Sequence, residues 1–106
     1  MINLSVIGPP DPLLARLLQR ALRDGIVVVG AEASDTVTQG ARAFPAGVPG
    51  VLAVRDADLG NGAATRVAIA APGRAVLTTV PGGHYDYVSG TSMAVALTSG
   101  VVALAL

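Results

Sequence analysis

The sequence predicts an α/β domain built on a mostly parallel sheet with flanking helices. Several short apolar runs are rich in β-branched residues, the pattern of strands that are covered on both faces. An amphipathic stretch separates the first two runs, so that strand, helix and strand follow one another within about thirty residues. With 106 residues, 52% of them hydrophobic, the chain suits one small domain or a part of a larger one.

The first strand–helix–strand unit occupies the N-terminal third. Residues 2–7 predict a buried strand, and Asp11 with Pro12 marks the start of a helix that Gly25 ends. Residues 26–29 predict the second strand, which should lie parallel to the first after a right-handed crossover. The helix carries one apolar stripe, expected to face the sheet: Leu13, Leu14, Leu17, Leu18, Ala21 and Leu22.

The remaining elements are shorter. The predicted strands are residues 51–54 and 67–69, followed by a hairpin of residues 76–80 and 85–88. Residues 32–49 read as a loop and 56–62 as a polar turn. A final apolar helix is predicted from about Ser92 to the C-terminus.

Charge and composition exclude several classes of function. Seven basic and seven acidic residues give zero formal net charge, which argues against a nucleic-acid partner. Without cysteine there is neither a disulfide framework nor a thiolate metal site. The apolar run 93–106 is shorter than the roughly 20 residues that span a bilayer, so we expect no membrane segment. Residues 1–4 lack the basic n-region of a signal peptide, so none is expected within this sequence, and the compartment is left open.

Residues 87–94 hold the most informative motif. Gly90 permits backbone angles closed to other residues, and Thr91 or Ser92 is expected to cap the following helix. Ser92 then lies at a helix N-terminus, where backbone N–H groups and the helix dipole favour a developing negative charge. This placement suits a nucleophilic serine whose own N–H serves an oxyanion.

The string Gly90-Thr91-Ser92-Met93-Ala94 resembles the nucleophile motif of the subtilases, the subtilisin-like serine proteases. Further segments resemble the family in the same order: residues 2–5 with Gly8, 24–29, 44–46 with 51–54, and 70–73. The resemblance implies a three-layer subtilisin-like fold in which residues 1–106 form a partial catalytic domain. It also implies a serine endopeptidase with Ser92 as nucleophile and backbone oxyanion donor. Main chain near Ser5 and Gly8 would pair with an extended peptide or protein substrate.

The same resemblance shows what the chain lacks. The family's catalytic Asp and His motifs precede the segment that matches residue 2, so an N-terminal segment would have to supply them. The family's oxyanion asparagine is replaced, with Ala33 or a neighbour at its position, and losing such a donor costs about 10²–10³ in turnover. A neighbouring Ser34 or a backbone N–H is the candidate for a partial substitute. Removing the base costs roughly 10⁶, so the isolated chain is expected to be nearly inert. Ala96 and Leu97 replace a proline and a histidine of the family motif, whereas Gly100 matches a family glycine, which implies close packing of this helix on the sheet.

Alternative interpretations remain at this stage. His84, the single histidine, reads as an ordinary turn residue, although a pseudo-triad with Asp86 and Ser92 is conceivable. Asp56 and Asp58 read as solvated turn carboxylates; calcium is the one cofactor to consider, and we expect none.

The alternative to an endopeptidase is a non-catalytic, subtilase-like domain that binds peptides or a partner. A third possibility is a piece with an uncovered apolar sheet edge that does not fold stably.

Overall fold

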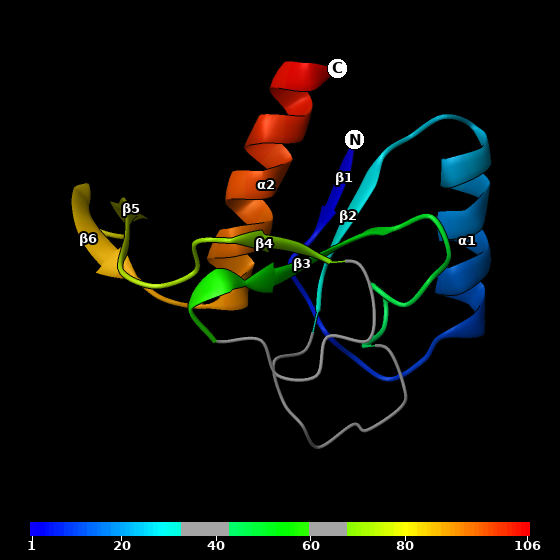
Figure 1. The fold of residues 1–106 in the computed structure, drawn as a ribbon, viewed down its shortest axis with the longest axis horizontal. Helices are drawn as coiled ribbons and strands as arrows, with labels where there is room; N and C mark the ends of the chain where they lie inside the picture. Colours follow the sequence, from blue (N-terminus) through cyan, green and yellow to red (C-terminus); the bar gives the residue numbers. More distant parts are fainter. Residues whose placement is uncertain (33–42, 60–67) are drawn as a thin grey trace.

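The computed structural model describes residues 1–32, 43–59 and 68–106, and its elements follow the predicted order (Figure 1). They are β1 (Ile2–Leu4), α1 (Pro12–Arg23), β2 (Val28–Ala31), β3 (Leu52–Asp56), a 3-10 turn (Ala57–Leu59), β4 (Ile69–Ala71), β5 (Val76–Val80), β6 (His84–Val88) and α2 (Thr91–Ala105). The predicted turn at residues 60–62 lies outside the described residues.

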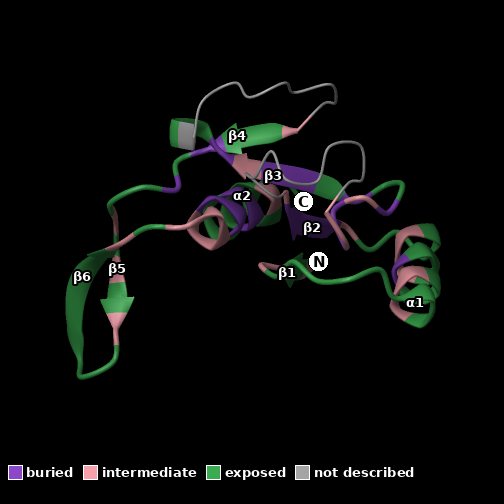
Figure 2. Ribbon diagram, turned by 90° about the horizontal axis from the view of Figure 1, so that it is seen from below, coloured by how far each residue is buried: buried purple, intermediate pink, exposed green. Residues whose placement is uncertain are grey.

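Four strands form one parallel sheet in the order β1-β2-β3-β4. Asn3 pairs with Val29, Gly30 with Ala53, and Val54 with Ile69. The two helices cover opposite faces of this sheet (Figure 2), which confirms the predicted three-layer α/β architecture.

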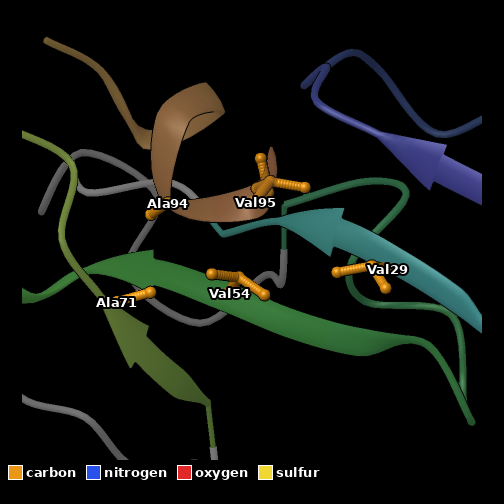
Figure 3. Packing of buried hydrophobic residues seen from close by; sticks show 6 residues of the cluster. Val29, Val54, Ala71, Ala94 and Val95 are labelled. Carbon is orange, nitrogen blue, oxygen red and sulfur yellow. The ribbon is translucent and has the colours of Figure 1, made fainter. Parts of the chain in front are cut away.

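Alternation along the strands divides the core between the two faces. Val28 and Val29 are both fully buried but point to opposite sides. On the α2 side, six residues pack together (Figure 3): Val29, Ala31, Val54, Ala71, Ala94 and Val95. On the α1 side, the buried residues are Leu18, Val28, Val48 and Val51, with Ile2, Leu4 and Leu14 packed against them.

Helix α1 begins as predicted and departs from prediction along its apolar stripe. The Asp11 carboxylate accepts the N–H groups of Leu13 and Leu14 at 2.9 Å, as an N-cap should. The expectation that the whole stripe faces the sheet is wrong, since Leu13 is 67% and Leu17 59% exposed. Only the part of the stripe around Leu18 reaches the sheet, because the stripe is wider than the contact.

Helix α2 is apolar on all sides, yet it is buried on only one of them. Leu97, Val101 and Leu104 form an exposed stripe, with Leu104 91% exposed. The expected close packing at Gly100 is wrong, because nothing described lies within 4 Å of a Cβ placed there. Helix α2 is shorter than a bilayer crossing requires, and no other helix in the described ranges meets that requirement.

Strands β5 and β6 form the predicted hairpin as a separate two-stranded antiparallel sheet. Figures 1 and 2 show it projecting away from the four-stranded sheet, immediately before α2. Most of β6 is exposed, including Tyr85 at 70% and Tyr87 at 67%.

Candidate active site

The turn into α2 places Ser92 in the first turn of the helix. Gly90 is the N-cap residue with φ of 155°, a conformation that residues with a Cβ rarely adopt. Its N–H donates to the Gly73 carbonyl at 2.7 Å, which anchors the turn to the chain after β4. The prediction that Thr91 or Ser92 caps the helix is wrong, since the helix starts at Thr91 and has no side-chain cap hydrogen bond.

The Ser92 side chain faces the end of β1. Its hydroxyl donates to the Ser5 carbonyl at 3.4 Å, across 87 positions of sequence, and the contact is partly buried. The first-turn N–H groups of a helix lack intrahelical acceptors, and the dipole adds partial positive charge there. A negative charge that develops on an oxygen atom near Ser92 would therefore be stabilised by these N–H groups and by the helix dipole.

The structure places Ser5 at this site and joins Gly8 to a different segment. Residues 5–7 extend the β1 chain past Leu4, where the pairing with β2 ends. Val6 and Ile7 are 59% and 52% exposed. The Gly8 N–H donates to the Phe44 carbonyl at 3.0 Å, forming an isolated antiparallel bridge. The N–H of Gly8 is thus already engaged within the chain.

His84 lies at the far end of the hairpin from Ser92. It pairs with Val80 next to the turn, while Val88 at the other end of β6 leads into α2. A strand rises about 3.3 Å per residue, so roughly 13 Å of β6 separates His84 from Val88. Asp86 accepts the backbone N–H of its neighbour Tyr87 at 2.7 Å. The geometry therefore does not bring the three members of the pseudo-triad together.

Asp56 is a buried residue at the end of β3, and the expectation of a solvated turn carboxylate is wrong for it. It is 3% exposed, and its Oδ1 accepts the Asp58 N–H at 2.9 Å. Strand β3 runs two residues beyond the predicted end and carries Asp56 beneath the Gly73 turn. Within residues 1–32, 43–59 and 68–106, no three potential metal ligands are gathered.

Residues 3–106 match the model of the subtilase family, which covers nearly the whole chain. The chain belongs to the subtilase family.

The subtilase chain is 33% identical over 118 residues to subtilisin of Bacillus pumilus, spanning 100% of this chain and 42% of that protein. Against subtilisin E of Bacillus subtilis the identity is again 33%, over 30% of that protein. Among solved structures, the prenylagaramide maturation protease PagA superposes with a TM-score of 0.79 at 32% identity, over 99% of this chain and 42% of that one. The chain therefore spans less than half the length of these relatives.

Two features of this subtilase bear on the predicted site. Ala33, the expected replacement of the oxyanion asparagine, lies outside the described residues together with Ser34. Sequence reasoning missed the hydrogen bond from Asn3 Nδ2 to Ser99 Oγ, at 3.0 Å, which joins β1 to α2. Its signal was present: Asn3 and Ser5 alternate in an apolar strand, and Ser99 interrupts an apolar helix seven positions after Ser92.

Proposed function

We propose that the polypeptide carrying this sequence is a serine endopeptidase with Ser92 as its nucleophile. The observation that carries the proposal is the position of Ser92 in the first turn of α2, with its hydroxyl against the Ser5 carbonyl. The Ser92 oxygen attacks the scissile carbonyl carbon and the Ser92 N–H stabilises the resulting oxyanion. The base that takes the Ser92 hydroxyl proton returns it to the departing amine, and water then hydrolyses the ester on Ser92.

The base for this reaction would come from an N-terminal segment that also carries its orienting aspartate. A serine hydroxyl is a weak nucleophile and needs a base within hydrogen-bond reach. The hydroxyl of Ser92 contacts a main-chain carbonyl, and His84 sits at the hairpin tip. The relatives are more than twice as long as this chain, which leaves room for such a segment.

Exposed apolar surface supports the view that residues 1–106 are a partial domain. Strand β1 has a single neighbour within the described sheet, and Figure 2 shows its outer edge between the two helices. The exposed stripe Leu97, Val101 and Leu104 lies on one helix, and the exposed pair Leu13 and Leu17 on the other. Surfaces of this kind mark places where further protein packs.

The proposed substrate is an extended peptide that adds to the main chain between Ser5 and Gly8. Val6 and Ile7 leave this stretch exposed beside Ser92. Peptides that pair with exposed main chain in this way gain affinity from backbone hydrogen bonds. The second oxyanion donor would come from the stretch around Ala33. Without the N-terminal segment, turnover should fall by about 10⁶.

The alternative is a non-catalytic domain that binds peptides or a partner at the same strand. It is favoured by the contact of Ser92 with a carbonyl instead of a base. A fluorophosphonate probe separates the two, applied to the natural polypeptide and to the 106-residue chain. The endopeptidase hypothesis predicts that the natural polypeptide has a mass well above 10.5 kDa. It also predicts that the probe labels Ser92 in the natural polypeptide and not in the 106-residue chain. A natural mass of 10.5 kDa without labelling would leave binding as the function.

A further inference from the structure

Four polar side chains connect β1 with α2 in a continuous series of hydrogen bonds. Asn3 and Ser5 alternate onto the same face of the β1 chain, and Ser92 and Ser99 are two helical turns apart on one stripe of α2. Ser5 Oγ donates to Asn3 Oδ1 at 2.8 Å, and Asn3 Nδ2 donates to Ser99 Oγ at 3.0 Å. Ser92 Oγ donates to the Ser5 carbonyl at 3.4 Å.

The two crossings between strand and helix differ in strength. At 3.4 Å, the Ser92–Ser5 contact is long for a hydroxyl donor, whose bonds are about 2.5–3.0 Å. The Asn3–Ser99 bond has ordinary length and ends on a serine that is only 6% exposed. The weak contact thus lies at Ser92, and the stronger one lies two turns further along α2.

Asn3 is also the residue that holds Ser5. The pairing of β1 with β2 ends at Leu4, so Ser5 lies past the last paired position. The Asn3 amide uses its oxygen for Ser5 and its nitrogen for Ser99. One amide side chain therefore links the stretch beyond Leu4 to the helix that carries Ser92.

We infer that Asn3 is a positioning residue, which acts through Ser99 to set the separation between the Ser5 main chain and the Ser92 side chain. This inference rests on the proposed function, in which a peptide pairs beside Ser5 and is attacked by Ser92. Loss of the link lets the strand move relative to the helix. A displacement of about 1 Å between reacting groups costs up to about 10²-fold in rate.

The test compares two deletions of a buried hydroxyl at adjacent positions of α2. Ser99→Ala removes the partner of Asn3, whereas Thr98→Val removes a hydroxyl that has no hydrogen-bond partner in the described structure. Both are made in the natural polypeptide in a Ser92→Cys background, because a thiolate at this position reacts whether or not a base lies beside it. Rates are measured for a peptidyl chloromethyl ketone and for iodoacetamide.

Ser99→Ala should lower the ratio of peptidyl to iodoacetamide rate by about tenfold, while Thr98→Val leaves it unchanged. Asn3→Ala removes the same hydrogen bond from its exposed end. This variant therefore still measures the effect of losing the bond if Ser99→Ala unfolds the chain. It should give the same loss, and the double variant Asn3→Ala with Ser99→Ala should lose no more than either alone. The inference would be overturned if the Ser92→Cys protein prefers the peptidyl reagent and all variants keep the same ratio of peptidyl to iodoacetamide rate.

Amide chemical shifts of Ser5 and residue 92 give a second readout that needs no peptide. Ser99→Ala should move both resonances more than Thr98→Val does, and equal shifts would overturn the inference. If the starting protein shows no preference for the peptidyl reagent but the shifts still move, the proposed function fails and the positioning role of Asn3 stands.

Discussion

Replacing Gly73 with alanine should lower the free energy of unfolding by about 2 kcal/mol, because the added methyl group would overpack the site. A Cβ built on Gly73 would lie 2.6 Å from Cγ of Asp56 and 2.8 and 2.9 Å from its two oxygens. Both residues are buried, so the carboxylate has little room to withdraw. Gly73 is not among the glycines with positive φ, so the penalty comes from contact and not from backbone strain.

The carboxylate should account for most of this penalty. Overpacking of a well-packed site costs about 1–3 kcal/mol. Asp56→Ala removes the atoms that the new Cβ meets, so Gly73→Ala in that background should cost less than about 0.5 kcal/mol, because no overpacked contact remains. The coupling free energy between the two substitutions should then be about 1.5 kcal/mol or more.

Urea unfolding of the four proteins of this cycle, followed by circular dichroism, measures the coupling. Gly100→Ala is the matched control, since nothing described lies within 4 Å of its added Cβ. At this exposed helical position, alanine should raise stability by about 1 kcal/mol. The reasoning is refuted if Gly73→Ala costs the same with and without the Asp56 side chain, or if it costs less than the control gains.

Substitutions at three further positions test the packing and the cap of α1. Val54→Ala should lower the free energy of unfolding by about 2–3 kcal/mol, since two methyl groups leave a fully buried site; a loss under about 1 kcal/mol in urea unfolding would contradict this. Asp11→Ala should cost about 1 kcal/mol by removing the acceptor for two N–H groups, and Asp11→Asn should cost less, as thermal unfolding would report. Leu104→Gln should change the stability of this chain by less than about 0.5 kcal/mol. In a longer polypeptide it should cost more, and equal effects would argue against the proposed covering segment.

Local signals predicted the order of the elements. The Asp11 cap, the apolar runs and the hairpin turn each depend on a few adjacent residues, and each appears in the structure. Strand ends moved by up to three residues, as where β1 stops at Leu4 and not at residue 7, because pairing with a neighbour, which no local pattern reports, decides where a strand stops. Asp56 looked like a turn residue for this reason, yet it belongs to β3.

Features that depend on distant residues were less predictable. Periodicity marked the apolar stripe of α1 but not how much of it the sheet covers. Leu13 and Leu17 were therefore predicted to face the sheet, although both are exposed. Ser92 was proposed as nucleophile from its motif, and the family resemblance suggested a peptide-pairing strand at Ser5, but the contact between these two residues needed the structure. The bond from Asn3 to Ser99 joins residues 96 positions apart and needed the structure.

Trapping of an acyl group on Ser92 tests the central proposal most directly. The natural polypeptide would be mixed with a slowly hydrolysed peptide ester, quenched in acid, digested and examined by mass spectrometry. The account predicts an acyl adduct on the peptide that contains Ser92, and loss of both adduct and turnover in Ser92→Ala. Turnover that continues in Ser92→Ala, or an adduct on another residue, would contradict it.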